Sequence, residues 1–155
     1  MEAKTKVHAE DGKQEIVITR EFDLPLALLF KAYVEADIVE QWMGTKVLKL
    51  ENKKHGSWQF ETSDPKGNVV FKANGTIHDF IPERQIIRTF QIENTGFDAQ
   101  LEFLDFEALT ADTSKLTMQI IYRSVALRDQ MLKLPFAQGL NMAHNRLQDI
   151  VTKLK

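Results

Sequence analysis

The stretch ITREFDLPLALLFKAYVEADIVEQWMG, residues 18–44, decides the fold. It completes an alternating run that ends at Phe22 and carries Arg20 on its apolar face, and such alternation is typical of a strand. Pro25 then favours the start of a helix, because a residue in the first turn needs no N–H partner. Apolar residues follow at helical spacing as far as Tyr33. The stretch therefore predicts a strand followed directly by a short helix.

A second short helix is predicted before the next strand. Ile38 and Trp42 are four residues apart and therefore share one helical face. Gly44 is a typical residue at a helix end. Two short helices between the first two strands are well placed to close one end of a sheet, and we expect Trp42 to belong to that closure.

Six further strands are predicted downstream, separated by turn sequences. The plainest turn is SDPKGN, in which Asp64, Pro65 and Gly67 occupy the positions that a type I turn prefers. Short turns between consecutive strands favour an antiparallel sheet. The predicted strands cover residues 46–51, 56–63, 69–80, 85–93, 98–109 and 115–124.

The C-terminal region is predicted to be helical. Ser124 suits the cap of a short turn through Leu132, and Pro135 suits the start of a long helix that ends near Leu154. The long helix is amphipathic. Its apolar stripe consists of Phe136, Leu140, Ala143, Leu147, Ile150, Val151 and Leu154.

These elements predict the α+β class, with a curved antiparallel sheet of about seven strands around a long C-terminal helix. Internal repeats and linkers are absent from the sequence, so residues 1–155 are expected to form one domain. Residues 1–13 are polar and are expected to be frayed or to form an edge strand. A single helix covers only part of so wide a sheet, so the sheet must curl or be covered.

Composition excludes several classes of protein. Apolar residues make up 43% of the chain, which argues against disorder. The net charge of −2 offers no basic field for a nucleic acid. Cysteine is absent, which removes disulfides and thiolate catalysis. Neither a signal-peptide pattern nor an apolar run of membrane-spanning length is present. We therefore predict a cytoplasmic protein with no membrane span and no nucleic-acid partner; oligomeric state is not indicated.

The sequence contains no recognisable catalytic, metal-binding or cofactor-binding motif. Its histidines, His8, His55, His78 and His144, lack the i, i+2 or i, i+4 spacing of ligand pairs and are interpreted as surface or turn residues. The glycines never cluster into a phosphate-binding loop. We therefore predict no metal and no cofactor. No enzyme class is indicated, although a catalytic triad assembled in space leaves no such sequence signal.

Three segments resemble the family related to the C-terminal domain of the activator of the 90-kDa heat-shock protein ATPase. They are REFDLPLALLFKAYVEADIVEQWMG (residues 20–44), GTIHDFIPERQIIRTF (residues 75–90) and FAQGLNMAHNRLQDIVTKL (residues 136–154). The first has Leu24-Pro25, Leu29-Phe30, Ala36-Asp37 and Trp42 with Gly44 at the places where the family has equivalent residues. Where this chain has Gly139-Leu140, the family usually has Gly-Trp.

The resemblance implies the helix-grip fold of the START-like or birch-pollen-allergen-like (SRPBCC) superfamily, in which a curved sheet grips the C-terminal helix around an apolar cavity. An apolar cavity is the usual character of a small-molecule site. An ordinary filled core remains the alternative, because periodicity does not separate the two. The candidate ligand-binding residues are Phe30, Trp42, Trp58, Phe60, Phe71, Phe90, Phe103, Met118, Ile120, Phe136, Gly139, Leu140 and Ala143.

Charged residues within the apolar strands are candidates for polar contacts to a ligand. Arg20, Arg88, Glu93 and Asp105 lie in or beside apolar runs, and the two arginines are the candidate polar anchors. The alternative is that these side chains point to solvent on the outer face of the sheet. A charge that enters a cavity needs a partner, so a facing carboxylate is the pattern to expect.

Residues 127–140 are a candidate gate, in which Met131, Leu132, Leu134 and Phe136 would cover one mouth of the cavity. Gly139 would allow the helix to pass close to a strand or ligand. A kinked helix start is the alternative interpretation of this segment.

Three hypotheses about function follow. The first is a helix-grip protein that binds an apolar or amphipathic small molecule between the sheet and the C-terminal helix. The second is a protein-interaction module related to co-chaperones of the 90-kDa heat-shock protein, with a solid core. The third, implied by some relatives in the superfamily, is an enzyme of the cyclase or hydro-lyase type.

Overall fold

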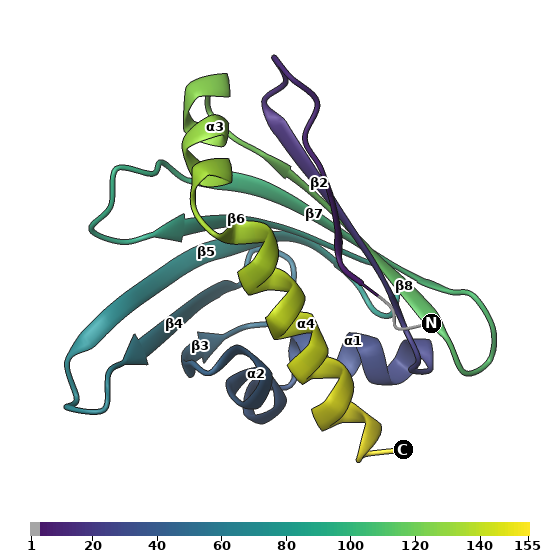
Figure 1. Cartoon of the computed structure of the whole chain (residues 1–155). Helices are drawn as coiled ribbons and strands as arrows, with labels where there is room; N and C mark the ends of the chain where they lie inside the picture. Colours follow the sequence, from purple (N-terminus) through teal and green to yellow (C-terminus); the bar gives the residue numbers. More distant parts are fainter. Residues whose placement is uncertain (1–3) are drawn as a thin grey trace.

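The computed structural model describes residues 4–155 and confirms the predicted α+β helix-grip architecture. Its strands form one antiparallel sheet in the order β1-β2-β8-β7-β6-β5-β4-β3, and helix α4 lies across the concave side of that sheet (Figure 1). The elements are β1 (Lys6–His8), β2 (Glu15–Phe22), α1 (Leu26–Val34), α2 (Ala36–Met43), β3 (Lys46–Leu50), β4 (Ser57–Ser63), β5 (Val69–Ile81), β6 (Gln85–Ile92), β7 (Gln100–Ala108), β8 (Ser114–Ile121), α3 (Val125–Lys133) and α4 (Phe136–Thr152).

Among the described residues the sheet has eight strands, where the sequence predicts about seven. The additional strand is β1, which pairs with β2 through Val7 and Ile18. Three residues are too short to show an alternating pattern. The strand lies in the segment 1–13 for which an edge strand was one expectation; residues 1–3 lie outside the described part.

The two short helices between β2 and β3 are confirmed, as is the helix end at Gly44, whose φ of 65° lies in the left-handed region. Trp42 joins them: its indole Nε1 donates a hydrogen bond to the Ala32 carbonyl oxygen of α1 at 2.8 Å. The rings of Trp42 and Tyr33 lie 5.1 Å apart. Trp42 therefore fixes α2 against α1, and both helices also contact α4.

Local signals for the last two helices are also confirmed. The Ser124 hydroxyl caps α3 by accepting a hydrogen bond from the Leu127 N–H at 3.1 Å. Helix α4 begins directly after Pro135. Its inner face carries Leu147 and Val151, neither of which is exposed to solvent. The helix therefore buries the central part of the predicted stripe, whereas Leu154 lies beyond the helix end at Thr152 and is exposed.

A polar interface also ties α4 to β2 and to Thr5, which precedes β1. Arg20 of β2 donates to the Asn145 side-chain oxygen at 2.9 Å and to that of Asn141 at 3.2 Å. Thr5 bonds through its hydroxyl to His144 Nδ1 at 2.6 Å. The interpretation of His144 as a surface or turn residue is therefore wrong, because this ring is fully buried on the inner face of α4.

Candidate binding pocket

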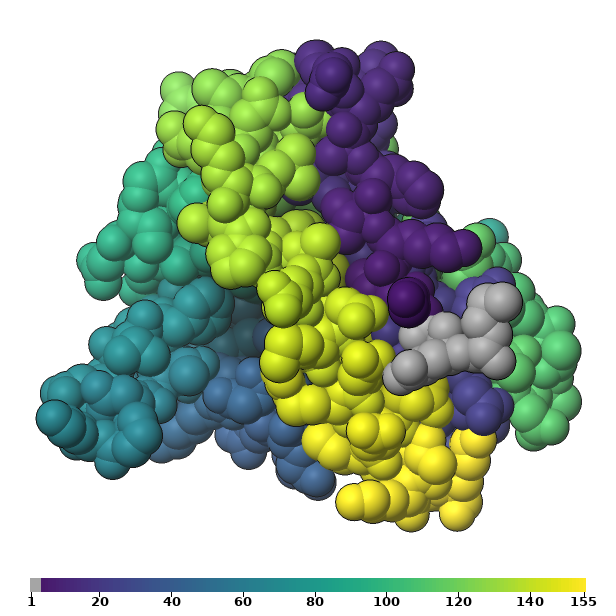
Figure 2. Space-filling view, viewed as in Figure 1, coloured from purple at the N-terminus to yellow at the C-terminus, as the bar shows by residue number. Residues whose placement is uncertain are grey.

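A pocket of about 270 Å³ lies between the concave face of the sheet and α1, α2, α3 and α4. Figure 2 shows the molecule hollowed on this face, between α4 and the strands drawn in blue and teal. One water occupies about 30 Å³ in the liquid, so the space exceeds that of a packing defect. It lies just below the range of roughly 300–1,000 Å³ found for small-molecule pockets.

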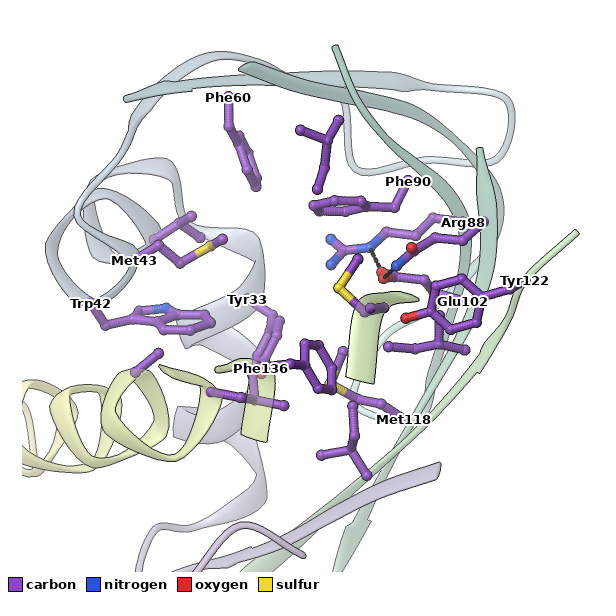
Figure 3. Close-up of a pocket in the computed structure, with 18 residues that line it drawn as sticks. Tyr33, Trp42, Met43, Phe60, Arg88, Phe90, Glu102, Met118, Tyr122 and Phe136 are labelled. Atoms are coloured by element: carbon purple, nitrogen blue, oxygen red, sulfur yellow. Dashed lines mark hydrogen bonds and ion pairs between the residues drawn. The ribbon is translucent and has the colours of Figure 1, made fainter. Parts of the chain in front are cut away.

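Many of the predicted candidate residues contribute to the pocket wall. Trp42 projects from α2, and Phe60 and Phe90 project from β4 and β6 (Figure 3). Helix α4 closes the opposite side. The predicted residues that line the pocket are Trp42, Phe60, Arg88, Phe90, Met118, Ile120, Phe136, Leu140 and Ala143.

Other candidates lie outside the pocket. Phe30 packs into the core, with its ring 5.0 Å from that of Phe106. Trp58 is fully buried behind the wall, and Phe71 lies half-buried on β5. Phe103 alternates with the inward-facing residues of β7 and therefore points to the other face of the sheet. The expectation that Phe103 faces the cavity is corrected by this alternation.

Gly139 does not provide a close approach between α4 and its neighbours. It is exposed, and a Cβ atom added there would meet nothing within 4 Å. The close approach occurs at Gly75 instead, where an added Cβ would lie 1.9 Å from the Thr89 carbonyl oxygen and 2.5 Å from Trp58 Nε1. Glycine is therefore required where β5 passes the Trp58 ring.

The candidate gate is only partly in place. Met131 of α3 and Phe136 of α4 line the pocket, as expected for a segment that covers one mouth. Leu134 between them is 50% exposed and faces away. Arg128 is buried and donates to the Glu10 carbonyl oxygen, so α3 is bonded to the connection between β1 and β2.

Polar side chains enter the pocket at one place on the sheet. Arg88 of β6 and Glu102 of β7 are directly paired in the register, and Arg88 Nε donates to Glu102 Oε1 at 3.0 Å. Gln100, two residues before Glu102, donates to Glu102 Oε2 at 2.8 Å. Figure 3 shows the Arg88 guanidinium directed into the pocket beside Glu102. The pocket thus combines apolar walls with one charge-paired polar cluster.

Trp58, which lies outside the pocket, contacts the guanidinium of Arg88. The Arg88 guanidinium carbon lies 5.2 Å from the centre of the Trp58 ring, within reach of a cation–π contact. The Trp58 ring in turn packs against Phe60 and Phe90, at 4.7 and 5.2 Å between centroids. A residue outside the pocket therefore restricts the orientation of the charged residue inside it.

Two tyrosines lie on the pocket wall. Burial raises the pKa of the Tyr122 hydroxyl, and the nearby Glu102 carboxylate raises it further, so this hydroxyl keeps its proton. It finds no hydrogen-bond partner among the described residues. Burial likewise raises the pKa of Tyr33. The Tyr33 hydroxyl lies 3.4 Å from His144 Nε2.

The remaining charged candidates do not reach the pocket. Arg20 is buried on the correct face of β2, but its guanidinium bonds to the side chains of α4. Glu93 accepts a hydrogen bond from the Asn74 side chain at 3.2 Å. Asp105 is exposed and accepts from Gln85. Of the two predicted anchors, the structure brings only Arg88 to the cavity.

Several residues of the pocket wall were not among the predicted candidates. Glu102 and Gln100 alternate in step with Leu104 and Phe106, so the pattern of β7 indicates that their side chains face inward. Tyr122 continues the inward phase of β8 in the same way. The residues that line the pocket without having been singled out as candidates are Ile18, Tyr33, Val39, Met43, Ile92, Gln100, Glu102 and Tyr122.

Residues 4–155 also bear on metal binding and on membrane-spanning helices. Within that range no three His, Asp or Glu side chains gather in a way that would hold a metal ion. In the same range, none of the helices has both the length and the apolar character needed to cross a bilayer.

Comparison with solved structures shows the same fold in bacterial proteins. The chain resembles a Rhodobacter sphaeroides protein with a TM-score of 0.87 at 16% identity, covering 97% of this chain and 99% of that one. A Mycobacterium smegmatis protein gives a TM-score of 0.85 at 16% identity, and the match covers 98% of this chain and 99% of that one. An Arthrobacter aurescens protein gives a TM-score of 0.83 at 12% identity, and the match covers 96% of this chain and 91% of that one. At these identities the likeness shows the fold alone.

Sequence comparison adds the family. Curated proteins gave no significant match to the chain. The profile of the family described as "Activator of Hsp90 ATPase homolog 1-like protein" matches residues 23–152, from the end of β2 to the end of α4. This range contains all but one of the pocket-lining residues, the exception being Ile18. The chain therefore belongs to the Activator of Hsp90 ATPase homolog 1-like family.

Proposed function

We propose that the protein binds a compact apolar or amphipathic small molecule in the pocket between the sheet and α4. The observation that carries this proposal is the mostly apolar space of about 270 Å³, into which Trp42, Phe60 and Phe90 project. Apolar walls with a few convergent polar groups are typical of small-molecule sites. The modest volume favours a ligand of one or two rings over a long-chain lipid.

The proposal is tested by thermal unfolding in the presence of a panel of one- and two-ring apolar and amphipathic compounds. A ligand at 100 times its dissociation constant stabilises the folded state by about 2.7 kcal/mol. For a domain of this size the midpoint should rise by about 5–10 °C. A flat result across the panel would contradict the proposal.

A variant whose pocket is filled by a larger side chain tests whether the stabilising ligand binds there. Ala143 lines the pocket on α4, so Ala143→Phe should occupy the space and abolish the stabilisation by ligand. Ala137 lies on the exposed side of the same helix, and Ala137→Phe makes the same chemical change outside the pocket. Ligand stabilisation that survives Ala143→Phe as fully as Ala137→Phe would place binding elsewhere.

A second proposal is an interaction with a chaperone of the 90-kDa heat-shock class, and its support is the family match over residues 23–152. It predicts that the purified chain is retained by immobilised chaperone, with Ala143→Phe retained equally well. Absence of a complex, together with ligand stabilisation, would favour the small-molecule proposal alone.

A further inference from the structure

We propose that the ligand carries an uncharged oxygen acceptor, such as a ketone carbonyl, on its apolar body, and that Arg88 donates to this oxygen. This inference rests on the proposed function and specifies the chemistry of its ligand. The observations behind it concern the unused hydrogen-bond donors of the polar cluster and the charge already present there.

Arg88 has donors to spare inside the pocket. Its Nε–H is used by Glu102, and its terminal nitrogens make no hydrogen bond within residues 4–155. The side chain is 11% exposed, and Figure 3 shows its terminal nitrogens facing the open space. The contacts with Glu102 and with the Trp58 ring hold the guanidinium in place. A ligand oxygen would therefore meet a donor group that is already oriented.

The charge of Arg88 is already balanced. Glu102 is 4% exposed, and its two carboxylate oxygens accept from Arg88 and Gln100 respectively. A carboxylate on the ligand would give the pocket a net negative charge among apolar walls and beside Glu102, where desolvation of the anion is costly. A carbonyl oxygen accepts the same Arg88 hydrogen bonds without adding charge. The cluster therefore favours a neutral acceptor over an anion.

Tyr122 adds a second donor on the same wall. It follows β8 directly, and its hydroxyl is buried without a partner among the described residues. In Figure 3 this hydroxyl points inward, toward the side of the pocket that carries Glu102 and Arg88. Buried hydroxyls are nearly always hydrogen-bonded, so an unpartnered one at a pocket wall favours a polar atom supplied by a ligand.

Three naphthalenes of nearly the same shape separate the alternatives in a calorimetric titration. 2-Acetylnaphthalene presents a carbonyl, 2-isopropenylnaphthalene replaces that oxygen by CH₂, and 2-naphthoate presents a carboxylate. A hydrogen bond from a charged donor predicts that the ketone binds about tenfold or more tightly than the hydrocarbon. The ketone should also bind about tenfold or more tightly than the carboxylate, because of the anion's desolvation cost.

Two variants assign the preference to the cluster. Arg88→Met/Glu102→Met removes both charges together and should abolish the advantage of the ketone over the hydrocarbon. Tyr122→Phe removes one hydroxyl and should reduce that advantage. Cooperative urea unfolding shows that each variant is folded, and the ratio of ketone affinity to hydrocarbon affinity within each variant is the readout. Arg123→Met, at an exposed arginine, is the control and should preserve the full preference.

The outcomes distinguish this inference from the proposed function. Equal binding of ketone and hydrocarbon would overturn the inference and leave the pocket as an apolar binding site. Tightest binding of the carboxylate would overturn it in favour of an anion anchor. A ketone preference that persists in Arg88→Met/Glu102→Met would overturn the role of Arg88. Failure of all three compounds to bind would contradict the proposed function itself.

Discussion

Arg88 and Glu102 face each other across β6 and β7, and their side chains form an ion pair of 3.0 Å within the pocket wall. The sheet register creates this pair, because directly opposed residues of an antiparallel ladder bring their side chains together on one face. The pair is nearly buried, so it differs in energy from the exposed pairs elsewhere on the chain. Loss of one partner is therefore expected to cost more stability than loss of a partner in an exposed pair.

Arg88→Met should destabilise the fold by about 3–5 kcal/mol, because it leaves the Glu102 carboxylate buried without its counter-ion. Arg88→Met/Glu102→Met should recover most of that loss, since apolar replacement of a buried pair is often neutral. Urea unfolding measures both. The control is Arg123→Met, which breaks a pair whose side chains are 75% and 50% exposed and should cost less than about 1 kcal/mol. A double variant as unstable as the single one would refute the argument.

Tyr122→Phe should leave the free energy of unfolding unchanged or raise it. The hydroxyl has no partner among the described residues, so its removal ends a desolvation cost without breaking a bond. The contrasting variant is Ser114→Ala, whose hydroxyl donates to the Leu24 carbonyl oxygen at 2.7 Å in the core. That change should cost about 1–3 kcal/mol, because the carbonyl is left unsatisfied. Urea unfolding of both variants is the test, and a larger loss in Tyr122→Phe would indicate an unrecognised partner.

Two glycine-to-alanine changes should have opposite signs. Gly75→Ala places a Cβ atom 1.9 Å from a backbone oxygen, so β5 must shift and stability must fall. Gly139→Ala adds a methyl group to an exposed helical position with open space around it. It should stabilise the chain by about 1 kcal/mol, the difference in helix propensity. Thermal unfolding of the two variants is the measurement, and a stable Gly75→Ala would contradict the close approach to Trp58.

The fold was predictable because its signals are local. Alternation in β2 and β8, the Pro25 helix start and the stripe of α4 each arise within a few turns or one strand. An edge strand was one of two expectations for residues 1–13, but the sequence did not decide between them, because β1 is only three residues long and its stability comes from pairing with β2. The sheet order follows from the family's fold more than from any one segment.

The site was less predictable, because it depends on which face each residue takes and on what covers that face. Glu102 and Phe103 point to opposite faces of β7, and the aromatic residue Phe103 resembles a cavity-lining residue more than the charged Glu102 does. The side chains of Arg20 and Arg88 both point to the inner face of the sheet. Only the tertiary structure reveals that the Arg20 guanidinium bonds to side chains of α4 instead of entering the pocket. The volume of the pocket is the hardest feature to predict, because it depends on how several elements pack together and not on any one segment.

Acid should weaken the fold through His144. Burial, assisted by the nearby Arg20 cation, lowers the pKa of this imidazole from its usual 6.5 to about 3. The other side chains bonded to the ring, Thr5 and Tyr33, contribute hydroxyls. The folded state thus holds His144 neutral, whereas the unfolded chain takes up a proton below about pH 6.5. Stability from this group is complete above that pH and falls toward pH 3, with a slope approaching about 1.4 kcal/mol per unit.

Urea unfolding between pH 7.5 and 5 isolates this effect, because most carboxylates titrate lower. The parent chain should lose about 2 kcal/mol over that interval from His144 alone. His144→Gln should be less stable at pH 7.5, because it disturbs a buried ring, but its stability should change less with pH. His8→Gln alters an exposed imidazole and should retain the parent slope. Identical slopes in the parent chain and His144→Gln would refute a neutral buried histidine, whereas a flattened slope would identify this ring as the main acid-sensitive group in that range.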